Sequence, residues 1–267
     1  MKFSRTLLLT AALFPAAAAQ AYEVTISFAN LSGANGAAIS PFFIALHNGS
    51  YTAFNSASTT ASAALAHLAE TGDGSQLATQ FASLDPNGQS AEVKASVNGF
   101  GPGIYLPGGT GSITLNLDPT QDQYLSYYAM VVPSNDRFVG TESPTTVQLF
   151  DNSGNFIAYN QSFTGSAVWD AGAEATQLAG AVFVAGSNPA DNTLTPNGVI
   201  LPNADFSAYS GATTADGYVF NNLPSASSEL YSISVASAVP LPGAAGLFAA
   251  ALPLLAGLRR FGRSANV

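Results

Sequence analysis

Three acidic side chains lie in two short loops of the sequence, and each loop follows an apolar run. Asp136 comes after the run 130–132, and Asp170 and Glu174 come after a second run that ends at Trp169. We predict that both runs are buried strands, so that the three carboxylates meet at one rim. A hard divalent cation such as Ca²⁺ takes six to eight oxygen ligands of this kind. The spacing alone also fits a turn-forming Asp and a solvated Glu.

Four segments resemble, in this order, those of the spondin N-terminal domain family: SPFFIALH at 40–47, LAETGD at 68–73, PSNDRFVG at 133–140 and WDAGAE at 169–174. The resemblance covers about residues 22–177. It implies an all-β, antiparallel β-sandwich similar to the calcium- and lipid-binding domains of the synaptotagmin kind. It also implies a Ca²⁺ ion held by Asp136, Asp170 and Glu174. Two positions depart from the family: Arg137 stands where Trp is usual and adds a positive charge beside the cation, and Glu174 stands where Asp is usual.

Both ends of the chain carry targeting signals. Residues 1–21 have a charged start, a short apolar stretch and small residues, which predicts a secretory signal peptide. Residues 237–267 contain VPLP, an apolar stretch and three arginines. This tail resembles the PEP-CTERM sorting tail that exosortases process in Gram-negative bacteria, although Leu241 stands in place of the namesake Glu. A permanent membrane anchor with a cytoplasmic basic end is the alternative.

Residues 22–236 form the predicted sandwich domain, and its charge is very uneven. All 16 acidic residues of the chain lie there, against Lys94 and Arg137 as the basic ones. Such a surface attracts cations and repels phosphate backbones, so we expect no nucleic-acid partner. Solubility alone would also explain the acidity. The chain has no cysteine, so disulfides do not stabilise it.

Hydrophobic periodicity predicts the elements of the domain. Two short helices are expected at 61–71 and 75–84, ended by Gly72 and Pro86, with Asp73 or Ser75 as a cap. Expected strands are an alternating one at 22–28, an edge strand at 39–46, a central one at 124–132, a hairpin of 147–150 with 156–161, and strands at 179–186 and 231–235. The glycine-rich segments 98–103 and 107–111 are expected to be loop tips.

Little in the sequence favours catalysis. No serine lies in a G-x-S-x-G motif, and the two histidines are His47 and His67. We expect His47 to be a hydrogen-bonded structural residue, with a metal role as the alternative. The sequence therefore predicts a non-catalytic, calcium-binding domain, secreted or at the cell surface, that serves adhesion or associates with extracellular polysaccharide or a surface protein. The alternative is a secreted carbohydrate-active hydrolase that uses Asp170 and Glu174 as a carboxylate pair.

Overall fold

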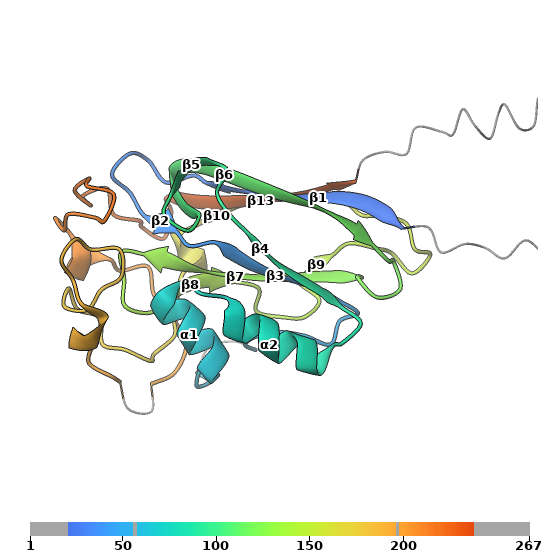
Figure 1. Cartoon of the computed structure of the whole chain (residues 1–267), viewed down its shortest axis with the longest axis horizontal. Helices are drawn as coiled ribbons and strands as arrows, with labels where there is room; N and C mark the ends of the chain where they lie inside the picture. Colours follow the sequence, from blue (N-terminus) through green and yellow to red (C-terminus); the bar gives the residue numbers. More distant parts are fainter. Residues whose placement is uncertain (1–20, 56–57, 196–197, 238–267) are drawn as a thin grey trace, which may run out of the picture.

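Thirteen strands and two α-helices make up the part of the chain that the computed structural model describes, residues 21–55, 58–195 and 198–237. The strands form two antiparallel layers packed face to face (Figure 1). This arrangement confirms the predicted all-β sandwich class, while the likeness to synaptotagmin-type domains stays a prediction. Within these ranges no helix is long and apolar enough to cross a membrane. Residues 1–20 and 238–267, which hold nearly all of the expected signal peptide and sorting tail, lie outside the described residues.

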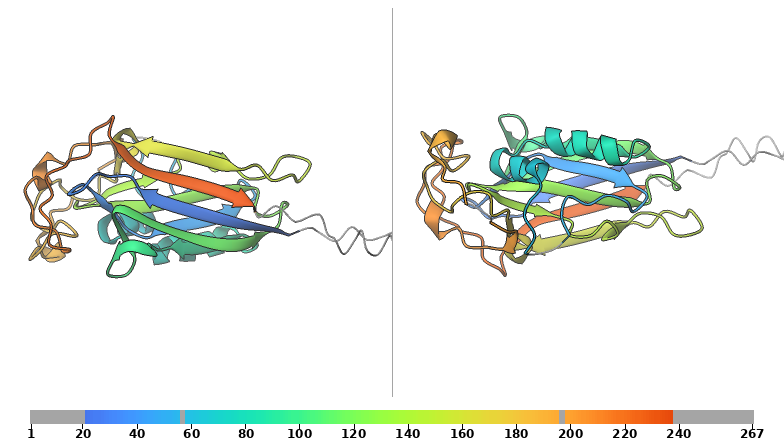
Figure 2. Two further views of the ribbon diagram at one scale, coloured as in Figure 1. Left: turned by 90° about the horizontal axis from the view of Figure 1, so that it is seen from above. Right: turned by 90° about the horizontal axis from the view of Figure 1, so that it is seen from below.

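The two layers share one short strand. The first layer contains β10 (Tyr159–Thr164), β13 (Glu229–Ser237), β1 (Tyr22–Asn30), β6 (Ile104–Leu117) and β5 (Val97–Phe100). The second contains β4 (Gln89–Val93), β3 (Phe42–His47), β7 (Tyr124–Val132), β8 (Arg137–Gly140), β11 (Trp169–Asp170), β12 (Leu201–Pro202) and β9 (Val147–Gln148). β2 (Ala38–Ile39) pairs with both β6 and β7 and so joins the layers at one end. Helices α1 (Ala63–Thr71) and α2 (Ser75–Leu84) cover the outer face of the second layer (Figure 2).

The core between the layers is formed by the alternate side chains of each strand that point toward the opposite layer. In β1 the side chains of Val24, Ile26 and Phe28 are buried, whereas the intervening ones are partly or fully exposed, as predicted. Phe28 stacks on Phe42 of β3 with ring centroids 3.9 Å apart. Because these rings come from opposite layers, their burial, about 150–250 Å² each, holds the two sheets together.

β3 is buried on both faces. Phe42, Ile44 and Leu46 pack between the layers, whereas Phe43 and Ala45 pack under the helices. The prediction of an edge strand here is wrong, because β3 is hydrogen-bonded to β4 on one side and to β7 on the other. The proline that suggested an edge lies just before the strand and interrupts no ladder bond.

The helices confirm their prediction closely. α1 ends where Gly72 takes a left-handed conformation, with φ of 73°, and its amide donates to the Leu68 carbonyl. The N-cap of α2 is Gly74 and not Asp73 or Ser75 as predicted, although Asp73, one residue before it, accepts a hydrogen bond of 2.9 Å from the first amide of the helix, that of Ser75.

Two predicted strand arrangements are wrong. The segments 147–150 and 156–161 do not form a regular hairpin, because β9 pairs with β7 and β10 pairs with β13. A single bridge, Phe150 to Phe156, connects them. Residues 179–186 form isolated bridges and no strand, since Gly180 and Phe183 have φ of 73° and 68°, which ends an extended run.

The glycine-rich segment 107–111 lies inside β6 and is not a loop tip. Its glycines serve close packing instead. A Cβ atom on Gly111 would lie 2.0 Å from the Lys94 carbonyl oxygen, so this position admits no side chain.

His47 is a buried structural residue, as expected. Its Nδ1 accepts the Gly49 amide at 3.0 Å, and its Nε2 lies 3.0 Å from the Ser126 hydroxyl. Burial lowers its pKa from 6.5 to about 4, although the charge of Asp85 opposes this shift. The folded protein therefore keeps His47 neutral where the unfolded chain is protonated.

We expect His47 to make stability fall as the pH drops from about 6.5 to about 4, by up to about 3 kcal/mol. Urea unfolding at several pH values gives the free energy of unfolding of the wild type and of His47→Gln. The contribution of His47 is the difference between the two proteins in how steeply this free energy changes with pH. Parallel pH profiles of the two proteins would contradict the prediction.

Candidate functional site

Strand pairing brings the two acidic loops together. β8 and β11 are antiparallel with Arg137 opposite Asp170, and the Ala171 amide donates to the Asp136 carbonyl at 3.1 Å. Asp136 and Asp170 therefore stand at the same end of neighbouring strands, as predicted. The segment that follows β11 gathers at this end of the sandwich, as the gold and orange parts at the left of Figure 1 show.

Asp136 is buried, with 1% of its surface exposed. Its Oδ2 accepts hydrogen bonds from the amides of Ala173 (2.8 Å) and Glu174 (2.9 Å), so it holds the second loop by its backbone. Its Oδ1 is buried and has no hydrogen-bond partner. Burial and the nearby charge of Asp170 raise the pKa of Asp136 from 3.8 to about 6, against the opposing effect of the two amides.

Glu174 also has a buried carboxylate oxygen without a hydrogen-bond partner. It is 9% exposed, and its Oε2 is buried without a partner. Burial, together with the charges of Glu70 and Asp136, raises its pKa from 4.5 to about 7. Glu70, on α1, is thus a fourth carboxylate of the cluster, and the sequence did not indicate that it belongs there. The one feature of the sequence that could have indicated this role of Glu70 is its place in the LAETGD segment.

Asp170 is occupied by protein partners. Its Oδ2 forms an ion pair with the Arg137 guanidinium and accepts from Asn203 at 3.3 Å, while its Oδ1 accepts the Gly172 amide at 2.8 Å. Arg137 is 1% exposed and also donates to the Thr176 hydroxyl (3.1 Å). The positive charge at position 137 therefore faces Asp170 and is held in a fixed place.

Further contacts fix the guanidinium. Arg137 donates to the Asp205 carbonyl at 3.2 Å, and its Cζ lies 6.0 Å from the centre of the Phe206 ring, a cation–π distance. Its Nε has no partner. Both contacts come from the loop after β12, a region whose role the sequence did not indicate.

A buried amide supports the first acidic loop. Asn135 Oδ1 accepts from the Tyr209 hydroxyl (2.7 Å) and from the Gln177 amide (3.1 Å). Its Nδ2 donates to the Ala179 carbonyl (3.2 Å) and to Asn192. All four hydrogen-bonding positions of the amide are filled, so Asn135 joins three distant segments beneath the site.

The cluster as a whole carries excess negative charge. Glu70, Asp136, Asp170 and Glu174 share a single guanidinium, and a cavity of about 390 Å³ opens beside Asp170 and Glu174. Among the residues described, no group of three or more acidic, histidine or cysteine side chains is arranged to hold a metal ion as it stands. The structure thus brings the three predicted ligands near one another, with Asp170 turned to Arg137.

A hydrolase site is not supported by the histidines. His47 contacts the Ser126 hydroxyl, but both residues are fully buried, and the His47 Nδ1 accepts an amide where a catalytic triad needs it to donate to a carboxylate. His67 lies at the surface and bonds Asp73 at 3.3 Å.

A protein-family comparison matches more than half of the chain. The family described as Spondin_N matches residues 33–190, a range that includes both acidic loops and both helices. No curated protein matches the chain.

Proposed function

Because the chain belongs to the Spondin_N family of non-enzymatic extracellular domains, we propose that it is a non-catalytic extracellular domain that binds Ca²⁺. The ligands in this proposal are Asp136, Asp170 and Glu174. The domain serves adhesion or attachment to an extracellular matrix.

One observation carries the calcium proposal: Asp136 Oδ1 and Glu174 Oε2 are both buried and both lack a hydrogen-bond partner. Buried polar atoms without partners are rare and costly, and a carboxylate oxygen is the donor that Ca²⁺ prefers. Burial is the main cause of the raised pKa of both groups; the charge of Asp170 adds to it at Asp136, and the charges of Glu70 and Asp136 add to it at Glu174. The donor set therefore fits a hard cation at Asp136 and Glu174, whereas Asp170 shares its charge with Arg137.

When bound, Ca²⁺ supplies the positive charge that these carboxylates lack. The protein's own contribution is positional. Asp136 already binds the backbone of the second loop through Oδ2, so a ligand at its Oδ1 would fix both loops at once. A more rigid loop end is a better surface for a partner, because less conformational entropy is lost on binding.

The partner we propose is an extracellular polysaccharide or a surface protein. We further propose that residues 1–21 direct export and that residues 237–267 are recognised by an exosortase-like processing enzyme or remain as a membrane anchor. The support is the sequence of these segments, since nearly all of both lies outside the described residues.

Calcium titration by calorimetry, with thermal melting of chelator-stripped protein, tests the site. We expect saturable binding with a dissociation constant of about 0.1–1 mM, the range of extracellular modules. A tenfold to hundredfold excess of calcium should then add about 1–3 kcal/mol to the free energy of unfolding.

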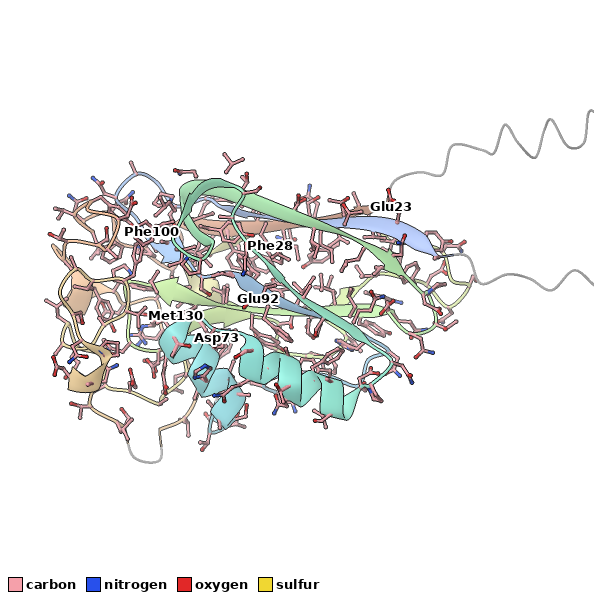
Figure 3. All side chains as sticks on the ribbon, viewed as in Figure 1. Glu23, Phe28, Asp73, Glu92, Phe100 and Met130 are labelled. Carbon is pink, nitrogen blue, oxygen red and sulfur yellow. The ribbon has the colours of Figure 1, made fainter. Side chains whose placement is uncertain are left out.

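The double variant Asp136→Asn, Glu174→Gln should lose this binding. Asp170 is left unchanged, because removing it would also break the ion pair with Arg137. Glu23→Gln is the matched control: it removes an exposed acid at the far end of the molecule (Figure 3). Unchanged calcium binding in the double variant would show that the ion binds elsewhere.

A further inference from the structure

A second pocket lies between the end of α1 and the edge of the sandwich, and none of the four clustered carboxylates lines it. Its volume is about 230 Å³. Two of the four segments that resemble the family meet there: Ser40 and Pro41 form one wall, and residues 71–73 form another. This pocket is smaller than the roughly 300–1,000 Å³ of sites for drug-sized ligands, so it suits a small group.

The interior of the pocket is apolar. Met130 and Val132 of β7 are fully buried beneath it, and Ile104 and Val182 line its sides. Such a surface favours a hydrocarbon group, because transfer of apolar area out of water contributes about 25 cal/mol per Å².

The rim is charged. Asp73, Glu92 and Lys94 line the pocket with Met130, and Figure 3 shows Asp73 at the turn after α1 and Glu92 on β4. Lys94 and Glu92 form an ion pair of 3.4 Å, so their charges largely cancel. Asp73 is the second carboxylate of the rim. His67 Nε2 lies 3.3 Å from its Oδ2, and the hydrogen bonds from Ser75 lower the pKa of Asp73 and keep it ionised.

The walls are held in place before any ligand binds. Ser40 accepts the Met130 amide at 2.9 Å, and Gly72 approaches Ser40 so closely that a Cβ atom would lie 2.8 Å from the Ser40 Cβ. The Asp73 carboxylate is fixed by the Ser75 amide and hydroxyl, both at 2.9 Å. Preorganised walls lower the entropic cost of binding.

We propose that this pocket binds an organic cation, an ammonium group on a short hydrocarbon body. The hydrocarbon contacts Ile104 and Val182, above the buried Met130, and the ammonium lies at Asp73 and Glu92. A free amine and the lysine side chain of a partner protein share this chemistry. The proposal does not depend on calcium.

Met130 provides a specific reporter. The chain has two methionines, Met1 and Met130, so methyl NMR of ¹³C-methionine-labelled full chain gives few signals, and Met130→Leu assigns the one from the pocket. We expect n-hexylamine to shift the Met130 methyl signal saturably, and 1-hexanol, the neutral counterpart, to bind at least fivefold more weakly. A separate titration with Nα-acetyl-lysine amide distinguishes the sources: tighter binding than hexylamine assigns the site to a protein lysine, and weaker binding to a free amine.

Three variants test the role of charge. Asp73→Asn keeps an oxygen that accepts the Ser75 amide and should weaken hexylamine binding about fivefold, the effect of one partly exposed charge pair. Lys94→Met keeps the aliphatic stem that packs on Gly103 but frees Glu92, so it should strengthen binding. Glu23→Gln, remote from the pocket, should change nothing.

The proposal is overturned by any of three results. Equal binding of hexanol and hexylamine would mean a purely apolar pocket. Weaker amine binding in Lys94→Met would mean that the lysine itself recognises ligands, and so that they are anionic. No shift of the Met130 signal with either amine would mean that the pocket is not a binding site.

Discussion

Replacing Arg137 by methionine is expected to lower the free energy of unfolding by about 3–5 kcal/mol, the largest effect of any single change at the site. Methionine fills a similar volume but removes the guanidinium that faces Asp170. The carboxylate then remains in a partly buried place with two neutral donors, from Gly172 and Asn203, and without a compensating charge. Urea unfolding in chelator at neutral pH measures the change.

The reason for so large an effect is the asymmetry of buried ion pairs. Forming the pair returns little net energy, whereas removing one partner leaves the desolvation cost of the other. Arg137→Lys is the matched control: it keeps the charge but cannot bond Thr176, Asp205 and Asp170 in one fork, so an intermediate loss is expected. A loss below about 1 kcal/mol in Arg137→Met would contradict the buried pairing.

The same variant should bind calcium more tightly than the wild type. Arg137 supplies positive charge to the cluster, and its removal leaves four carboxylates without a counterion. Calcium should therefore restore part of the lost stability in Arg137→Met.

Asp136→Asn is expected to stabilise the calcium-free protein at neutral pH by about 1–3 kcal/mol. The pKa of Asp136 is raised from 3.8 to about 6, so between these values the folded state binds more protons than the unfolded chain. Stability therefore falls as the pH rises through this window and stays low above it. Asparagine removes this loss, because its oxygen still accepts the amides of Ala173 and Glu174 while its NH₂ group replaces the unpartnered oxygen.

Thermal melting from pH 4 to pH 8 in chelator checks this expectation. The wild type should lose stability relative to Asp136→Asn over about pH 4 to 6, and the order should reverse when calcium is added. Asp216→Asn, an exposed acid, serves as the control. A less stable Asp136→Asn protein at pH 7 would mean that the Asp136 carboxylate is compensated within the fold and carries no strain for a cation to relieve.

Hydrophobic periodicity and helix-ending residues correctly predicted the helices and the first strand. The 3.6-residue spacing between Ala61 and Leu68, closed by Gly72, predicted α1, and the two-residue alternation of 22–28 predicted β1. The prediction that the loops of Asp136 and Asp170 meet was also correct, because β7, which precedes Asp136, and β11 both pair with β8 in one sheet. Whether these residues hold calcium stays a prediction.

The failures concern contacts between distant segments. The sequence did not indicate that Arg137 pairs with Asp170, thirty-three residues away, or that it contacts the loop after β12. Nothing in local periodicity shows that Glu70 approaches Glu174, or that Phe183 takes a positive φ. Such features depend on how the long segment between β11 and β13 folds over the end of the sandwich.

The neighbouring positions of the first and last strands affect how the domain carries mechanical load. Val24 of β1 pairs with Ser237 of β13, so the start of β1 and the end of β13 lie side by side at one end of the sandwich. The acidic loops lie at the other end, near the pairing of Ala38 with Val132. A force between Tyr22 and Ser237 would open the β1–β13 ladder one pair at a time. A force between Ser237 and a partner held at the acidic loops would instead pull β13 along its length, loading its bonds to β1 and β10 together. A domain tethered at Ser237 and bound to a partner at the acidic loops therefore resists mechanical unfolding better than one pulled between Tyr22 and Ser237.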